Sequence, residues 1–217
     1  MSASTAHLAH HFDDAEQQFD AARLGMWLFL ATEIMFFGGL FAGYSLYRYR
    51  FPAAFAAASH HLNLWLGAIN TGVLLTSSLT MALAVRAAQT SDRRGTARLL
   101  GWTILLGSVF LGIKGFEYHH KFDENLVPGR TFSFPIADGT DVRLGEVELF
   151  FSFYFVMTGL HAAHMVIGII ILGVLLIAAR RGLFSAEYFT PVEMTGLYWH
   201  FVDIVWVFLF PLLYLIR

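Results

Sequence analysis

The sequence predicts an all-α protein, a polytopic integral membrane bundle with five transmembrane helices. Hydrophobic residues make up 57% of the 217 residues and charged residues only 14%, whereas soluble domains are about 45–50% apolar. Nearly all charges fall in short interruptions between long apolar stretches, which is the pattern of helices that cross a bilayer. The chain has no cysteine, which excludes disulfides, thiolate metal sites and a cysteine nucleophile. Its net charge of −2 gives no indication of nucleic-acid binding.

Each apolar stretch is long enough for the roughly 20 helical residues that cross the hydrocarbon core. The fourth stretch exceeds a perpendicular span, so we expect that helix to tilt or to extend into water. Segment 1–23 is polar and acidic where a secretory signal would be positive, so the first apolar stretch should remain as a membrane anchor. Residues 24–217 are expected to form a single membrane domain, with helices at about 24–47, 62–86, 97–118, 148–179 and 194–216.

The longest link between the expected helices is segment 119–147. Its Pro128-Gly129 and Asp138-Gly139 pairs are turn signals, so we expect an ordered loop or a short hairpin over the membrane face. No internal repeat is visible, which disfavours a transporter built from duplicated halves. The shorter links are expected at 48–61, 87–96 and 180–193.

Four of the five expected helices carry ionisable side chains inside the apolar stretch. In lipid such a group costs at least about 2.5–3.5 kcal/mol, so each must face protein, water or a partner chain. Three of the helices carry pairs spaced three residues apart, which places both members on one helix face. The single carboxylate and the three pairs are Glu33, Lys114 with Glu117, His161 with His164, and His200 with Asp203.

The depth of these residues along their helices predicts which of them can meet. Glu33, His200 and Asp203 all lie within roughly 9–14 Å of the N-terminal side, because the first and last helices run in the same direction. We therefore expect a hydrogen bond between Glu33 and a histidine. Lys114 and Glu117 lie toward the opposite side, where we expect a local pair and where the lysine could snorkel.

The three helix-borne histidines and two glutamates also resemble a carboxylate–imidazole ligand set. Two histidines three residues apart are not the Glu-x-x-His pairing of di-iron bundles, however, and intramembrane histidines more often bind to neighbouring side chains. We therefore expect no bound metal. No nucleophile–base arrangement or phosphate-binding loop is present, so no catalytic residue is expected in this chain.

Other aromatic and imidazole side chains are expected at the membrane surfaces. The pairs His60–His61 and His119–His120 should be interfacial or solvated. Most of the tryptophans fall near helix ends, as in an aromatic belt; they are Trp27, Trp65, Trp102, Trp199 and Trp206.

The number of Lys and Arg side chains outside the expected spans is seven on the N-terminal side and six on the other. This difference is too small to determine the orientation of the chain in the membrane. The tight basic link at 86–98 favours a cytoplasmic N-terminus and an external C-terminus.

Several motifs, in this order, resemble subunit III of the haem–copper oxidases, the cytochrome c oxidase type, over about residues 22–217. At the Lys114 position many members of that family have glutamine, so this sequence departs from the family there. The motifs are GMWLFLATEIMFFGGLFAGY, NTGVLLTSSLTMALA, LGIKGFEYHHKF, GLHAAHMVIG and WHFVDIVWVFLF, the last being the most specific.

The resemblance implies the short, five-helix bacterial form of this subunit. Members with seven helices have two more before the Glu-bearing helix, and this chain lacks them. Because removing two helices preserves the sidedness of the others, the resemblance also implies a cytoplasmic N-terminus in the bacterial inner membrane, with the C-terminus outside.

The resemblance further implies a non-catalytic accessory subunit of a proton-pumping terminal oxidase, which oxidises cytochrome c and reduces O2 to water. Haem and copper then belong to subunits I and II, and this chain packs on subunit I. It is expected to hold phospholipids in a V-shaped cleft between its first two helices and the rest. The family's polar motif positions, with structural, lipid-contact or subunit-contact roles, fall on Glu33, Glu117, His161, His164, His200 and Asp203.

Other functions remain open. A quinol oxidase subunit III is the nearest alternative, because the electron-donor site lies on another chain, and a nitric-oxide-reductase accessory protein is a third relative. From different classes come a secondary transporter, which should show discontinuous helices or inverted repeats, and an intramembrane metalloprotein.

Overall fold

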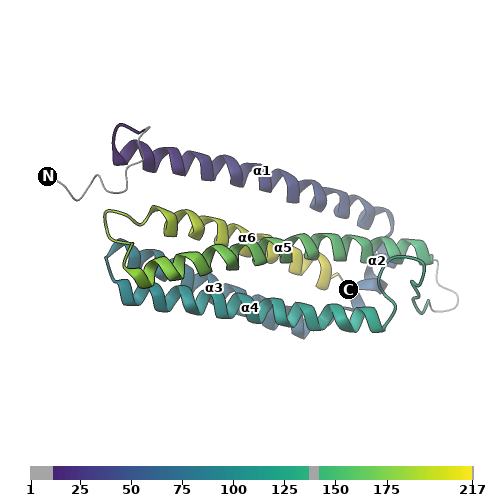
Figure 1. Ribbon diagram of the computed structural model, residues 1–217. Coiled ribbons are helices and arrows are strands. Elements are labelled where there is room, and N and C mark those ends of the chain that lie inside the picture. The colour runs from purple at the N-terminus through teal and green to yellow at the C-terminus, as the bar shows by residue number, and fades with distance from the viewer. Residues whose placement is uncertain (1–11, 137–141, 217) are drawn as a thin grey trace.

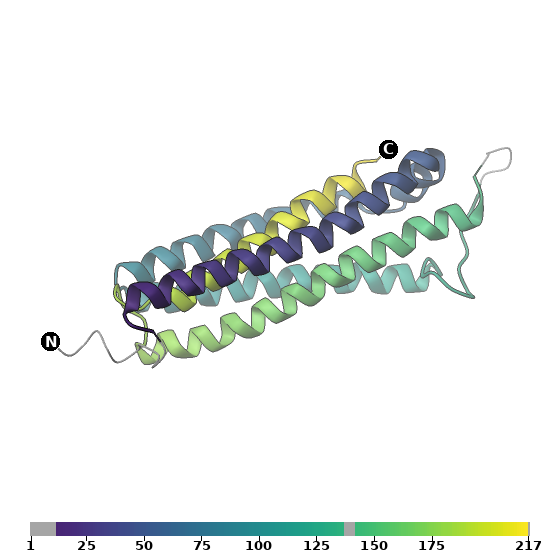
Figure 2. The same cartoon turned by 90° about the horizontal axis from the view of Figure 1, so that it is seen from above.

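The computed structural model describes residues 12–136 and 142–216, and the helices run side by side along one long axis (Figures 1 and 2). It confirms five helices that are long and apolar enough to cross a membrane. A short additional helix, α2, follows the first of them. The bounds are α1 Ala15–Arg50, α2 Pro52–His60, α3 Leu64–Gln89, α4 Arg93–Asp123, α5 Leu144–Arg181 and α6 Thr190–Tyr214.

The helices extend beyond the apolar stretches from which they were predicted. α1 begins within the segment expected to be polar, where the side chain of Asp14 accepts a hydrogen bond from the backbone N–H of Gln17 at 2.7 Å. This is an N-cap, and it satisfies a donor that the first helical turn leaves free. α4 and α5 both extend into the expected loop 119–147, of which residues 137–141 lie outside the described part. Apolar residues mark the membrane-embedded part of a helix, whereas caps determine where it ends.

α2 occupies a segment that was expected to be a link. Pro52 stands at its first position, where the missing N–H costs nothing, and the alanines that follow are strong helix formers. Phe55 is completely buried, with its ring 5.4 Å from the rings of Tyr44 and Phe150. The short helix therefore closes the bundle between α1 and α5.

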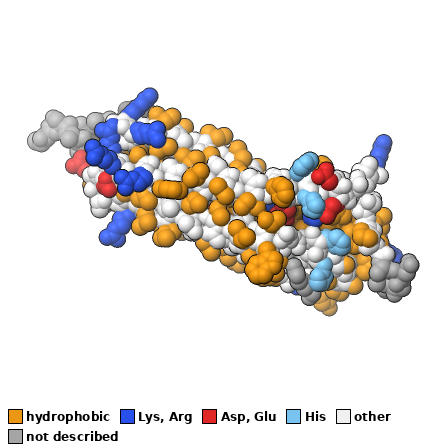
Figure 3. All heavy atoms as spheres, turned by 90° about the horizontal axis from the view of Figure 1, so that it is seen from below, with side chains coloured by type: hydrophobic (Ala, Val, Ile, Leu, Met, Phe, Trp, Pro, Cys, Tyr) orange, Lys and Arg blue, Asp and Glu red, His pale blue; other side chains and the backbone are white. Residues whose placement is uncertain are grey.

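The helix ends define two faces of the molecule, and Figure 3 shows Lys and Arg side chains gathered toward one end and His side chains toward the other. We call the first the arginine face; α1, α4 and α6 begin there. We call the other the histidine face; it contains α2, and α1, α4 and α6 end there. The histidines His60, His61, His119 and His120 are exposed, as expected. The arginine face carries Arg86, Arg93, Arg94, Arg98, Arg180 and Arg181.

α6 lies at the centre of the bundle and packs against α1, α3 and α5. Trp199 and Trp206 on this helix are 0% exposed, so the prediction that they belong to an aromatic belt was wrong. Trp199 fits between Gly107 of α4 and Gly168 of α5, where an added Cβ would come within 2.8 Å of its ring. The two glycines thus provide the space that draws this large ring into the core.

The first two membrane helices do not form a separate arm. α1 packs on α2, α5 and α6, whereas α3 packs on α4 and α6, and α1 does not contact α3 within the described residues. The V-shaped cleft expected between the first two helices and the rest is therefore not formed. The reason is that α6 lies between α1 and α3, so these two helices cannot separate together from the others.

Candidate functional site

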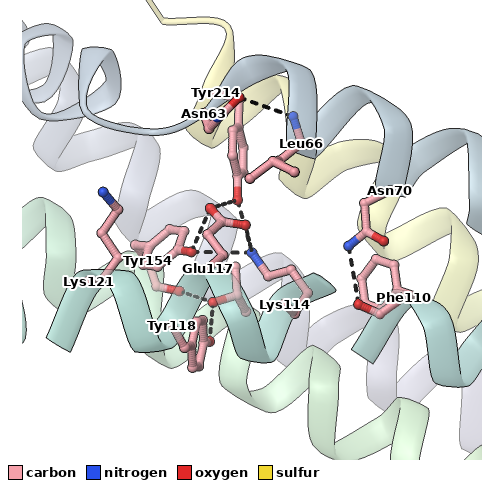
Figure 4. Close-up of polar contacts among 12 residues, drawn as sticks. Asn63, Leu66, Asn70, Phe110, Lys114, Glu117, Tyr118, Lys121, Tyr154 and Tyr214 are labelled. Carbon is pink, nitrogen blue, oxygen red and sulfur yellow. Dashed lines mark hydrogen bonds and ion pairs between the residues drawn. The ribbon is translucent and has the colours of Figure 1, made fainter. Parts of the chain in front are cut away.

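A buried ion pair lies near the end of α4 at the histidine face (Figure 4). Lys114 Nζ is 3.0 Å from Glu117 Oε2, and the two side chains are only 5% and 4% exposed. The spacing of three residues places both on the same face of the helix, as predicted. The expectation that Lys114 snorkels to the surface was wrong, because its side chain points into the bundle.

Two tyrosines complete this ion pair from neighbouring helices. Lys114 Nζ donates to the hydroxyls of Tyr154 on α5 at 3.2 Å and Tyr214 on α6 at 2.9 Å. Both hydroxyls donate in turn to Glu117 Oε1, at 2.9 and 2.5 Å. The Lys114 ammonium also lies 5.0 Å from the ring centroid of Trp206, an attractive cation–π contact. Such added partners are what a buried ion pair needs to offset its desolvation.

A second buried lysine, Lys121, holds the end of α4 against the turn that follows α2. Its Nζ donates to the backbone carbonyl of His61 at 2.8 Å and to Glu124 Oε2 at 2.6 Å. The carbonyl lies just after the last turn of α2, where backbone oxygens lack helical partners. This contact fixes the position of the α2–α3 turn at the histidine face.

Glu33 on α1 meets His164 on α5, which confirms the predicted contact between Glu33 and a histidine. His164 Nε2 is 3.2 Å from Glu33 Oε2, and His164 Nδ1 lies 2.8 Å from the carbonyl oxygen of Leu160. A carbonyl only accepts, so His164 Nδ1 is the donor in the second contact. The Glu33–His164 contact joins α1 to the bundle.

The remaining three predicted polar residues lie apart from these two pairs. His200 Nδ1 is 2.7 Å from the hydroxyl of Ser78, which links α6 to α3. The ring of His161 lies 5.4 Å from Phe110 and 5.2 Å from Trp206, and its nitrogens have no hydrogen-bond partner among the described residues. Asp203 is buried on α6, at 3% exposure.

The six predicted residues therefore occupy several separate places and form no common site. Within residues 12–136 and 142–216, no group of three or more His, Asp or Glu side chains is arranged to hold a metal ion. Sequence reasoning missed Tyr154 and Tyr214 as partners of the ion pair. The available signal was their hydroxyl groups, since a buried tyrosine in a phenylalanine-rich helix needs a hydrogen-bond partner.

Two largely apolar grooves flank α1. One, of about 390 Å³, lies between α1 and α6 and is lined by Trp27, Phe37 and Phe208 among others. The other, of about 430 Å³, lies on the α5 side, with Glu33 and His164 in its wall. α1 thus borders on space that fits apolar chains, and its Glu33–His164 contact faces that space.

Comparison with known proteins shows the family of the chain. The family model described as "Cytochrome c oxidase subunit III" matches residues 3–216. The cytochrome c oxidase subunit 3 of Thermostichus vulcanus is 34% identical over 205 residues, which cover 94% of this chain and 92% of that protein. The corresponding protein of Corynebacterium diphtheriae is 33% identical, with 89% and 87% covered. A probable quinol oxidase subunit 3 of Staphylococcus saprophyticus is 30% identical, with 97% and 96% covered. The chain therefore belongs to the cytochrome c oxidase subunit III family, and it is a multi-pass membrane subunit of a haem–copper oxidase complex.

Proposed function

We propose that this chain is the accessory subunit of a bacterial proton-pumping terminal oxidase that oxidises cytochrome c and reduces O2 to water. In this proposal it packs on subunit I, subunits I and II hold the haem and copper, and the chain itself catalyses no step. The observation that carries the proposal is that its intramembrane polar contacts join helices to one another. Glu33–His164 joins α1 to α5, His200–Ser78 joins α6 to α3, and Glu117 joins α4 to α5 and α6.

The same observation supports structural, lipid-contact or subunit-contact roles for the six predicted residues. Glu33 and His164 line the groove beside α5, so we assign them to lipid contact as well as to helix fastening. Glu117 and His200 fasten helices through the contacts described above. For His161 and Asp203, which are buried in the core, we propose packing roles.

We further propose that phospholipid acyl chains occupy the two grooves beside α1. Their walls are mostly aliphatic and aromatic side chains, and an acyl chain that fills such a groove gains van der Waals contacts along its length. This position replaces the cleft that the family resemblance implied.

The arginine face is proposed to lie in the cytoplasm and the histidine face outside the bacterial inner membrane. The helix ends that flank the two short links at the arginine face carry Arg86, Arg93, Arg94, Arg98, Arg180 and Arg181, and the cytoplasmic ends of membrane helices carry an excess of Lys and Arg.

Mild solubilisation is expected to yield this chain together with a haem-bearing subunit. The measurement is the visible spectrum of the fraction that contains the chain, purified through a tag on it. Migration of the chain alone under these conditions would count against the accessory role, and so would stoichiometric iron in the separated chain. The donor is then identified by turnover with reduced cytochrome c or with a quinol. Turnover with quinol alone would favour the second candidate, a quinol oxidase, which the Staphylococcus relative supports.

Replacing Glu33 by alanine is expected to leave the haem content of the complex unchanged, because the residue holds α1 and a lipid groove and binds no cofactor. The variant should retain less phospholipid or lose activity sooner during turnover. Lipid phosphorus per haem and the decay of activity with turnover measure the two effects. Met35→Ala is the matched control, since Met35 is 72% exposed on the same helix. Loss of haem from the Glu33→Ala complex would contradict this assignment.

A further inference from the structure

A cavity of about 340 Å³ lies at the histidine face between the α2–α3 turn and the end of α4. His60, His61 and Asn63 line it from the turn, and Glu117 and Glu124 line it from α4. Polar side chains, together with Leu62, Leu66 and Phe116, thus surround a space that leads from the surface toward the core.

The inner end of this cavity is the buried ion pair. Glu117 lines the cavity although its side chain is only 4% exposed, and it is bound there to Lys114. Leu66, on the first turn of α3, forms part of the same wall, and Figure 4 shows it beside Glu117 and Tyr214. The cavity therefore reaches the charged groups that the bundle buries.

The walls of the cavity are fixed by hydrogen bonds. Asn63 caps α3 by accepting from the backbone N–H of Leu66 at 3.2 Å, and Lys121 donates to the carbonyl of His61 at 2.8 Å. The first contact fixes the start of α3, and the second holds the α2–α3 turn against the end of α4, so the cavity is part of the fold itself.

The charges around the cavity are compensated within the chain. Lys114 is paired with Glu117 at 3.0 Å and Lys121 with Glu124 at 2.6 Å. A cavity whose lysines and glutamates cancel does not concentrate ions of either sign. Its many donors and acceptors instead suit water, which needs two to four polar partners.

We propose that this cavity is a water-filled vestibule that connects the water phase at the histidine face with the buried Lys114–Glu117 pair. Water in the vestibule hydrates one side of the pair and so lowers the cost of burying it. The proposal rests on this geometry alone and does not depend on the role of the chain in an oxidase.

The absence of cysteine from this chain allows a direct test by thiol labelling of the intact complex in membrane vesicles. Leu66→Cys places a thiol in the vestibule wall. Ile69→Cys on α3 and Val156→Cys on α5 are the controls, because both positions are exposed on the outside of the bundle, at 57% and 50%. Val156 is two residues from Tyr154, so it lies within roughly 3 Å of the depth of the ion pair. Tyr49→Cys, at 88% exposure near the end of α1, reports on which side the histidine face lies.

A membrane-impermeant thiol reagent is expected to modify Leu66→Cys at least about tenfold faster than either control, a difference of about 1.4 kcal/mol in activation free energy. The reagent should act from the side that labels Tyr49→Cys. Equal rates for all three positions, or labelling from the other side only, would overturn the proposal. Leu62→Cys, which is in the same cavity wall and only 2% exposed, replaces Leu66→Cys if that variant does not assemble with haem.

The assignment to water, and not to an ion, is tested with reagents of opposite charge. Cationic and anionic thiol reagents of equal size should modify Leu66→Cys at rates within about tenfold of each other, because the cavity has no strong field to steer either one. A larger preference for one sign would show an ion site and would overturn the assignment to water.

Discussion

Replacing Lys114 by methionine is expected to lower the free energy of unfolding by about 3–5 kcal/mol, because it leaves the Glu117 carboxylate buried without its cation. The tyrosine hydroxyls still donate to Glu117, but hydrogen bonds alone do not neutralise a buried charge. The measurement is reversible unfolding of the subunit in mixed micelles, or the temperature at which it separates from the complex.

Two further variants separate the charge from the side-chain volume. Lys114→Gln restores a neutral hydrogen-bond donor and is expected to cost less than Lys114→Met. The double variant Lys114→Met/Glu117→Gln removes both charges and should regain most of the lost stability, since a neutral pair carries no such desolvation cost. If the double variant proves as unstable as Lys114→Met, the ion pair is not the cause.

Replacing Trp199 by alanine is expected to cost about 3–5 kcal/mol through the cavity that the ring would leave in the core. The ring is fully buried between Gly107 and Gly168, and its Nε1 donates to the hydroxyl of Ser77 at 3.1 Å. Two rigid helix backbones form the walls of this slot, so the site has little capacity to collapse. The same unfolding measurement reports the loss.

The control for this variant is Trp102→Ala on α4, which removes the same side chain from a position that is 51% exposed. Its effect should be several-fold smaller, because no closed cavity forms. Trp199→Phe should lie between the two. Similar losses at Trp199 and Trp102 would refute the slot as the source of the stability.

The sequence was sufficient to predict the five membrane helices and to predict that Glu33 contacts a histidine. Both depend on quantities that run along a single helix, namely apolar length and depth at 1.5 Å per residue. Depth grouped Glu33 with His200, whereas the histidine that Glu33 contacts is His164 on α5 and His200 contacts Ser78. That a histidine is the partner was predictable, because a buried carboxylate in lipid needs a polar neighbour, but the choice between histidines depends on how the helices are arranged around α1.

The direction in which Lys114 points could not be predicted in this way. Its orientation depends on how α4 is rotated against α5 and α6, which local sequence does not determine. Snorkelling was a reasonable expectation for a lysine near a helix end, but two tyrosine hydroxyls and a carboxylate hold it inside. Trp199 was misplaced for the same kind of reason, because the glycines that admit its ring lie on other helices.

The loose packing of α1 has a consequence for how the protein assembles. In its most apolar stretch only 11% of the residues are buried, against 56% in α6. A helix in lipid satisfies its own backbone hydrogen bonds, so α1 is stable as an inserted segment before it touches the rest of the chain. Its association with α5 and α6 is then a second equilibrium, distinct from the folding of the other four spans. The equilibrium between associated and separated α1 depends on the Glu33–His164 contact and on what covers the outer side of α1. The position of α1 therefore responds to its surroundings more than that of any other membrane helix in the described part of the chain.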